Sequence, residues 1–200
     1  MLTHFELHQK LHLPMLLSTS ILLLNIACSP TLIEEEELKI DSKSTINNEA
    51  TTVNIGFDGS KSLSMWKNTL DFAENNNVKF TYFIVGTHLL SDDNRYFYRN
   101  YKDKKGKSDV GFGGSKEDVK NRLEYIYKAH SSGHEIASHA NGHWDGSEFT
   151  YDEWLDELKQ FEYFLRNAYE LNGLDEHKPL DWDQIPDSLI GFRAPLLAIN

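Results

Sequence analysis

Two histidines four residues apart, His139 and His143, are the residues whose types and spacing point most directly to chemistry. Gly142 lies between them and would allow a turn that aims both imidazoles at one point. With the carboxylate of Asp58, they make a three-ligand site suited to Zn²⁺ or a similar divalent ion, with one position left for water or substrate. Such an ion lowers the pKa of its bound water and polarises a carbonyl group. The alternative is that the two histidines are unrelated residues of a loop.

Other polar and aromatic residues have two interpretations each. Arg193, in the apolar segment GFRAP, forms either a surface salt bridge or a contact that orients an acidic side chain. Trp144 either packs at the rim of the site or offers a platform for a sugar ring. The aromatic cluster at 96–101 either stacks on sugar rings or packs within its own loop. His134 precedes an apolar run, and we expect it to be structural.

These residues must be positioned by strands and helices that alternate from residue 51 onward. Short β-rich or apolar runs predict strands at 51–57, 78–85, 134–139 and 188–193. The run at 78–85 is almost continuously apolar and β-branched, so we expect a strand buried on both faces. Strands that alternate with helices indicate a parallel sheet with right-handed crossovers.

Helical spacing of apolar residues predicts the intervening helices. The first covers 61–76, the second runs from a capping box at Ser115 and Asp118 to about residue 131, and the third begins at a capping box formed by Thr150 and Glu153. The apolar stripe of this third helix continues to residue 169.

The polar residues follow the predicted strands. In parallel β/α folds the functional groups lie beyond the carboxyl ends of the strands. The first predicted strand leads into Asp58, the third ends at His139 and the fourth ends at Arg193. The fold would therefore bring these three residues to one rim.

Composition limits the classes of function. The chain has 200 residues, with 31 Asp and Glu against 20 Lys and Arg, and the net charge of −11 argues against nucleic acid as a partner. Hydrophobic residues make up 40% of the chain, which is enough for a packed core. The single cysteine excludes an intramolecular disulfide and a cysteine-based zinc site. The length suits one domain but is short of the roughly 250 residues of a complete β/α barrel.

The N-terminal segment has the pattern of an export signal. Residues 16–27 are mostly apolar, too few to span a bilayer but of the right length for the core of a signal peptide. Cys28 follows directly and resembles the acceptor of a bacterial lipoprotein lipobox, with Leu24 one position away from the usual leucine. We therefore expect 1–27 to be a signal peptide and Cys28 to carry a lipid that anchors an exported protein at the bacterial cell envelope membrane. The alternative is an ordinary hydrophobic N-terminus.

The remainder divides into two parts. Residues 28–50 hold six acidic residues and two lysines, which predicts a disordered acidic tether. Residues 51–200 are expected to form the domain.

From about residue 53 to residue 195 the sequence resembles the polysaccharide deacetylase family, the NodB-homology or carbohydrate esterase 4 group. The segment GFDG at 56–59 is similar to the family's strand end T-F-D-D-G. The segment GHEIASHANGH at 133–143 closely matches the family's G-H-E-I-x-x-H-[ST]-x-x-H, and RAP at 193–195 matches R-x-P. The run VKFTYFIVG at 78–86 is similar to the strand V-x-A-T-F-F-V-x-G.

The resemblance implies an α/β fold, a deformed (β/α) barrel, and metal-dependent hydrolysis of N-acetyl or O-acetyl groups on a polysaccharide. By the family pattern the metal ligands are Asp58, His139 and His143, and the expected ion is zinc, with cobalt, nickel or manganese as alternatives. Arg193 corresponds to the residue that holds and tunes the catalytic aspartate. The expected partner is an acetylated polysaccharide.

The sequence departs from the family pattern in two places. The family has two adjacent aspartates, a general base and a metal ligand, whereas only Asp58 is present here. Aligned through Phe57 it is the base, and aligned through Gly59 it is the ligand; the ligand role is favoured. Asp145 is a candidate for the missing carboxylate, and with Trp144 it is a candidate for substrate binding.

The second departure concerns the general acid. The family places a catalytic histidine after the R-x-P motif, but this sequence ends five residues beyond Pro195, so we expect the C-terminal part of the barrel to be missing. An alternative to the enzyme is therefore a catalytically inactive envelope lipoprotein that binds glycan through the same fold. A third hypothesis is a different metal hydrolase that uses the same histidine pair.

Overall fold

A parallel sheet with helical crossovers forms the centre of the fold, in a computed structural model that describes residues 52–198. Its three strands are β1 (Gly56–Asp58), β2 (Thr81–Ile84) and β3 (Glu135–Ser138), in the order β1-β2-β3. The predicted α/β class with parallel strands is confirmed, and over the described residues the sheet is open rather than closed into a barrel. The predicted signal peptide at 1–27, Cys28 and the tether at 28–50 lie outside the described residues.

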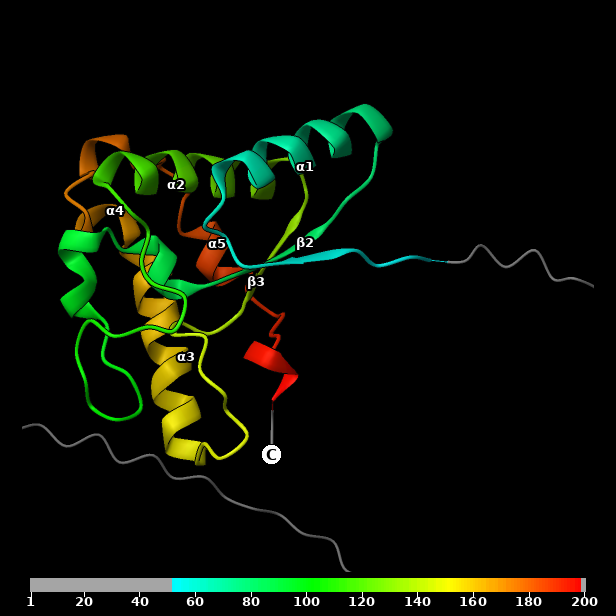
Figure 1. Cartoon of the computed structure of the whole chain (residues 1–200). Coiled ribbons are helices and arrows are strands. Elements are labelled where there is room, and N and C mark those ends of the chain that lie inside the picture. Colours follow the sequence, from blue (N-terminus) through cyan, green and yellow to red (C-terminus); the bar gives the residue numbers. More distant parts are fainter. Residues whose placement is uncertain (1–51, 199–200) are drawn as a thin grey trace, which may run out of the picture. The chain divides into compact units, whose positions relative to one another are not determined.

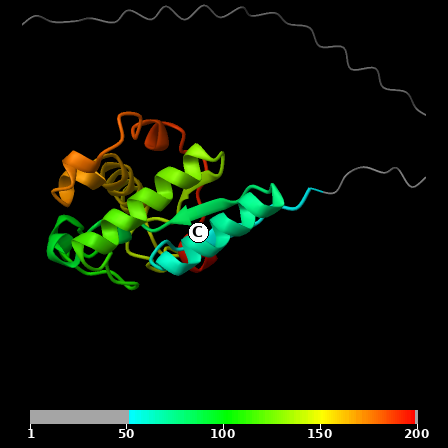
Figure 2. The same ribbon diagram turned by 90° about the horizontal axis from the view of Figure 1, so that it is seen from above.

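Two helices lie next to each other over one face of the sheet (Figures 1 and 2). They are α1 (Leu63–Asn76), which connects β1 to β2, and α2 (Lys116–Ser131), which precedes β3. The Ser62 hydroxyl caps α1 by accepting from the amide of Met65, and α1 ends at Asn77 in a left-handed conformation. The predicted capping box of Ser115 and Asp118 is present at the start of α2.

The second half of the chain is mostly helical. It contains α3 (Tyr151–Arg166), α4 (Ala168–Leu171) and α5 (Gln184–Asp187), and the capping box that begins α3 is confirmed. The prediction of one uninterrupted helix to residue 169 is wrong, because the chain leaves helical geometry at Asn167. The Asn167 side chain donates to the carbonyl of Tyr163 at 2.8 Å, a local bond that competes with the helical ladder.

Short 3-10 helices occupy several connections. They are η1 (Gly86–Leu89), η2 (Asp92–Phe97), η3 (Asp175–His177) and η4 (Pro195–Leu197). Both η1 and η2 belong to the long segment between β2 and α2. None of the helices between residues 52 and 198 has the length and apolar run needed to cross a bilayer.

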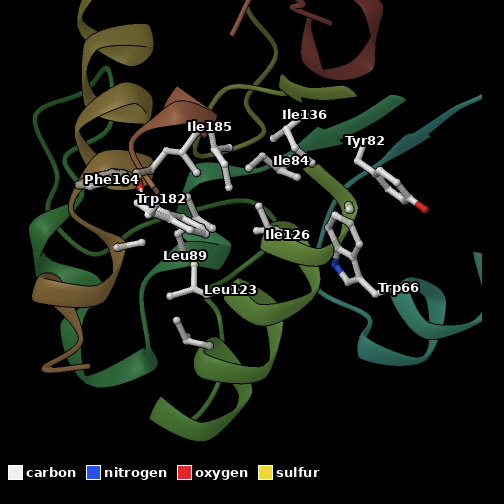
Figure 3. Close-up of a cluster of buried hydrophobic side chains, with 14 of the residues drawn as sticks. Trp66, Tyr82, Ile84, Leu89, Leu123, Ile126, Ile136, Phe164, Trp182 and Ile185 are labelled. Carbon is white, nitrogen blue, oxygen red and sulfur yellow. Dashed lines mark hydrogen bonds between the residues drawn. The ribbon is translucent and has the colours of Figure 1, made fainter. Parts of the chain in front are cut away.

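The hydrophobic core fills the space between the sheet and the helices (Figure 3). Trp66 of α1 stacks on Tyr82 of β2 at one end, with ring centroids 4.4 Å apart. At the other end Trp182 is fully buried and donates its indole N–H to the carbonyl of Leu165 at 2.9 Å. Isoleucine and leucine side chains from β2, β3, η1 and α2 lie between these ends.

Burial along β2 alternates, so the prediction of a strand buried on both faces is wrong. Tyr82 and Ile84 point into the core, whereas Thr81 and Phe83 are only partly buried. Successive side chains of a strand point to opposite faces, and α1 and α2 cover only one of them. The second face carries the candidate functional groups described below.

The prediction of a fourth strand at 188–193 is also wrong. The segment 188–193 makes a single parallel bridge, between Phe192 and Ser138, supported by bonds from Ser138 N to Gly191 O and from Arg193 N to Ser138 O. Two features stop the pairing from extending. The Ser188 amide still donates to Gln184 at the end of α5, and the chain turns away after β3 at Ala140, whose φ is 56°. The bridge is nevertheless enough to position Arg193.

Candidate functional site

The candidate site begins as a row of side chains across the sheet. Asp58 of β1 pairs in register with Phe83 of β2, and Phe83 pairs with Ala137 of β3. Tyr82 faces α1, so its neighbour Phe83 and the rest of this row face the opposite side. His139 follows Ala137 by two residues at the carboxyl end of β3. The pairing of the strands therefore determines which residues meet there.

Arg193 extends across this row. Its guanidinium lies over the ring of Phe83, 3.9 Å from the centroid, and its Nη1 donates to Oδ1 of Asp58 at 2.6 Å. A side chain at Gly56 would collide with the Phe83 ring and lie in tight contact with Arg193, so glycine leaves the room that this crossing needs. The ion pair is partly exposed, and such pairs contribute at most about 1 kcal/mol to stability. Its main effect is to orient the carboxylate.

His139 is held by the backbone of the same arginine. Its ring Nδ1 lies 2.8 Å from the carbonyl oxygen of Arg193, and because a carbonyl can only accept, Nδ1 carries the proton. Burial lowers the pKa of His139, while the bond to the Arg193 carbonyl and the charge of Asp58 act in the opposite direction. The lowered pKa favours the neutral imidazole, and the bond from Nδ1 to the Arg193 carbonyl leaves Nε2 as the nitrogen that could bind a metal.

His143 packs against His139. The two ring centroids are 5.0 Å apart with the planes nearly perpendicular, and the buried Nδ1 of His143 has no hydrogen-bond partner among the described residues. The prediction that Gly142 makes the turn is wrong: Ala140 and His143 have the positive φ angles, 56° and 58°. Glycine is needed at 142 for a different reason, because a side chain there would collide with Tyr98 and Trp144.

The donor types at this site suit a divalent metal ion. His139 has the second-nitrogen contact to a carbonyl that is typical of metal-bound histidines, and His143 has an unsatisfied ring nitrogen. Asp58 has one carboxylate oxygen bound to Arg193. Between residues 52 and 198, however, no three His, Cys, Asp or Glu side chains are gathered closely enough to hold one ion. The residue types thus fit a metal ion, and a complete three-ligand site would require the side chains of Asp58, His139 and His143 to move closer together.

The other predicted site residues differ in their surroundings. Trp144 is partly buried, donates its indole N–H to the Tyr98 hydroxyl at 3.1 Å and packs edge-on against Tyr101. Asp145 is exposed, and its carboxylate accepts from the amide of Ser147 in a local turn. The structure therefore does not bring Asp145 into contact with Asp58 or with either histidine.

The remaining candidates are structural or exposed. His134 accepts a hydrogen bond from the amide of Phe80 at 3.0 Å, which confirms its structural role. In the aromatic cluster at 96–101, Tyr98 is fully buried, whereas Tyr96 and Phe97 are exposed. Only part of that cluster therefore packs within the protein.

Sequence reasoning missed a buried arginine that holds the loop after Asp58. Arg122 on α2 is 1% exposed and donates to the carbonyls of Ser60 and Lys61 at 2.7 and 2.9 Å, and to that of His88 at 2.8 Å. The sequence does place Arg122 on the apolar face of α2, one turn before Ile126, and a charged residue in an apolar stripe needs buried partners. Glu157 stands in the apolar stripe of α3 in the same way, so its burial with partners could also have been predicted.

His88 is a second residue that sequence reasoning missed. It is buried in η1, with Nδ1 3.3 Å from the Ser60 hydroxyl and Nε2 without a partner among the described residues. Burial lowers the pKa of His88 to about 3, and the nearby charge of Arg122 adds to the effect. His88 is therefore neutral in the folded protein at neutral and mildly acidic pH.

Comparison with known proteins identifies the family of this architecture. The family profile described as polysaccharide deacetylase matches residues 45–173, more than half of the chain. None of the curated proteins matches the sequence.

Solved structures give further similarities, all at low identity. One is the Xyl-CE4 domain of a multidomain xylanase from the hindgut metagenome of Trinervitermes trinervoides, at 20% identity and a TM-score of 0.45, covering 74% of this chain and 49% of that one. Another is the chitin deacetylase from the fungal pathogen Colletotrichum lindemuthianum, at 16% identity and a TM-score of 0.43, covering 74% of this chain and 46% of that one. A third is a mutant of BA3943, a CE4 family pseudoenzyme with restored enzymatic activity. It has 15% identity and a TM-score of 0.43, and the match covers 74% of this chain and 38% of that one. The chain spans half or less of the length of these structures.

Replacing His88 is expected to flatten the acid dependence of stability. In the unfolded chain His88 regains an ordinary pKa near 6.5, so below that pH the unfolded state binds a proton that the folded state does not. Between pH 7 and pH 5 this costs the wild type about 2 kcal/mol of unfolding free energy, a loss that His88→Gln avoids. Urea unfolding at several pH values measures the difference. His177→Gln, at an exposed histidine, is the control, and parallel pH profiles for wild type and His88→Gln would contradict the account.

Proposed function

The chain belongs to the polysaccharide deacetylase family, and from this premise we propose that it is a metal-dependent hydrolase that removes acetyl groups from a polysaccharide. The observation that carries the proposal is the arrangement around Arg193, which binds the Asp58 carboxylate through its side chain and the His139 ring through its carbonyl. Arg193 thus contacts both Asp58 and His139, the two residues on which the proposed chemistry depends. The expected ion is zinc, with cobalt, nickel or manganese as alternatives.

Each residue has a role in this proposal. His139 and His143 would hold the ion through their free ring nitrogens, together with the oxygen of Asp58 that Arg193 does not occupy. A bound divalent ion supplies polarisation of the acetyl carbonyl and acidification of a water molecule. Arg193 orients the Asp58 carboxylate, and the Phe83 ring beneath it restricts the guanidinium to one position. Trp144, fixed by Tyr98, would offer its ring to a sugar at the edge of the site.

A second candidate function is glycan binding without hydrolysis. It is favoured by the single carboxylate at the end of β1, where Gly59 follows Asp58, and by the ion pair that already occupies one oxygen of that carboxylate. A carboxylate that coordinates a metal has little basicity left for proton abstraction, so one aspartate does not easily fill both roles. In this case the same rim would bind an acetylated glycan and release no acetate.

The proposed location is the bacterial cell envelope. It rests on the apolar run at 16–27 and on Cys28 directly after it, which suit a signal peptide and a lipid acceptor. A lipid at Cys28 would keep the domain near an envelope polysaccharide, with residues 28–50 as the connection.

Acetate release tests the proposed activity. We expect the full chain, supplied with Zn²⁺ or Co²⁺ and an acetylated chito-oligosaccharide, to release acetate, and we expect His139→Ala to reduce the rate at least ~100-fold through loss of a metal ligand. His177→Ala, at an exposed histidine, is the matched control and should keep the wild-type rate. A wild-type rate no higher than that of His139→Ala contradicts the hydrolase. Saturable binding of the same oligosaccharide without acetate would then favour the second candidate.

Lipid labelling tests the proposed location. Expression of the full chain in a bacterium supplied with an alkyne-tagged palmitate should give a labelled protein in the membrane fraction. Cys28→Ser should abolish the label and release the protein from that fraction, because Cys28 is the only cysteine in the chain. Equal labelling of wild type and variant, or a wild-type protein that carries no label, contradicts the lipid anchor.

A further inference from the structure

A buried carboxylate on α3 lies beneath the loop that carries both histidines. Glu157 is 4% exposed and is placed on the apolar face of α3, one turn before the buried Phe161. An acidic side chain is rarely found fully buried unless it has partners that compensate for the lost water. Its partners therefore indicate what it does.

Those partners are the backbone amides between the two histidines. Oε1 of Glu157 accepts from the amides of Asn141 and Gly142, both at 2.9 Å. The Asn141 side chain donates in turn to the main-chain carbonyl of Glu157. Burial raises the pKa of Glu157, and the two amide bonds act in the opposite direction. Glu157 and the loop are thus joined by three buried hydrogen bonds, two to the carboxylate and one to the main-chain carbonyl.

The loop needs such a restraint, because its backbone is strained. Ala140 and His143 both have positive φ angles, a conformation that costs a non-glycine residue roughly 1–2 kcal/mol. The two amides bound by Glu157 lie between these two residues. Without an acceptor beneath the loop, the strained residues would relax toward ordinary backbone angles, and the His143 ring would move with them.

The same carboxylate also reaches Trp144. The Tyr98 hydroxyl donates to Glu157, at 3.1 Å from Oε2, and accepts from the indole N–H of Trp144 at 3.1 Å. Gly142 leaves the room for Tyr98 and Trp144 to approach the loop. Glu157 is therefore a common anchor for the histidine loop and, through Tyr98, for the aromatic ring at the edge of the site.

We propose that Glu157 is a positioning residue that fixes the backbone between His139 and His143 and so sets the distance between the two imidazoles. The proposal rests on the proposed function in one respect, namely that these imidazoles bind a metal ion. Glu157 acts through the loop and does not itself touch the ion or the substrate.

Three substitutions at this position separate its properties. Glu157→Gln keeps the shape and one oxygen acceptor for the two amides. Glu157→Asp keeps the charge but withdraws the carboxylate by one methylene group. Glu157→Leu removes every acceptor and leaves both amides unpaired, which costs more than the loss of one hydrogen bond. Asn172→Leu is the matched control, because Asn172 is another buried polar side chain that binds backbone groups, at Ser91, Leu89 and Ala168.

Two measurements on the full chain give the readouts. The first is amide hydrogen exchange at Asn141 and Gly142 without metal, compared with the amides of β2. We expect exchange at least ~10-fold faster in Glu157→Leu, a smaller increase in Glu157→Asp, and near wild-type protection in Glu157→Gln. The second is the affinity for Co²⁺ by titration, which we expect to fall at least ~10-fold in Glu157→Leu and to recover in Glu157→Gln. Asn172→Leu should unfold more easily with neither readout changed.

The outcomes distinguish this proposal from the proposed function. Unchanged exchange at Asn141 and Gly142 in Glu157→Leu overturns the positioning role, as does a Co²⁺ affinity equal to that of Asn172→Leu. If Glu157→Leu does not fold, wild-type protection in Glu157→Asp overturns it equally. A wild-type chain that binds no Co²⁺ contradicts the proposed metal site instead, and amide exchange alone then decides whether Glu157 fixes the loop.

Discussion

The contact of Arg193 with Asp58 across the ring of Phe83 is the constraint on which the site depends. The arginine comes from the far end of the described chain and reaches the first strand by crossing the face of the sheet that α1 and α2 leave uncovered. Its carbonyl meanwhile binds His139. Because side chain and backbone of one residue are both engaged, the single bridge at Phe192 is enough to bring Arg193 into contact with both Asp58 and His139 at this rim.

Two buried charged residues hold the loops that carry the functional groups. Arg122 binds backbone carbonyls in the loop after Asp58, and Glu157 binds backbone amides between His139 and His143. Each lies on a helix, and each replaces lost hydration with several hydrogen bonds to main-chain groups. The fold thus uses the rigid faces of α2 and α3 to restrain irregular backbone, as strained loops at functional sites require.

The sequence predicts the elements and the rim residues, but not how the loops are held. Parallel strands that end at polar residues already indicate that Asp58 and His139 lie close together, and the capping boxes give the starts of α2 and α3. Spacing alone does not reveal which glycine permits a turn and which permits a close approach, and the role of Gly142 is therefore assigned incorrectly. The support from Glu157 depends on a contact with the histidine loop that only the packed structure specifies. The segment 188–193 has the composition of a strand, but the turn at Ala140 limits it to one bridge.

A crystal structure of the full chain grown with Co²⁺ tests the central claim most directly, because anomalous scattering locates the ion without assumptions. The account predicts one strong peak at the rim, with nitrogen atoms of His139 and His143 and an oxygen of Asp58 about 2.0–2.2 Å away, and with Arg193 still bound to the same carboxylate. A peak elsewhere on the protein, or a rim ion that leaves either histidine or Asp58 unbound, would contradict it.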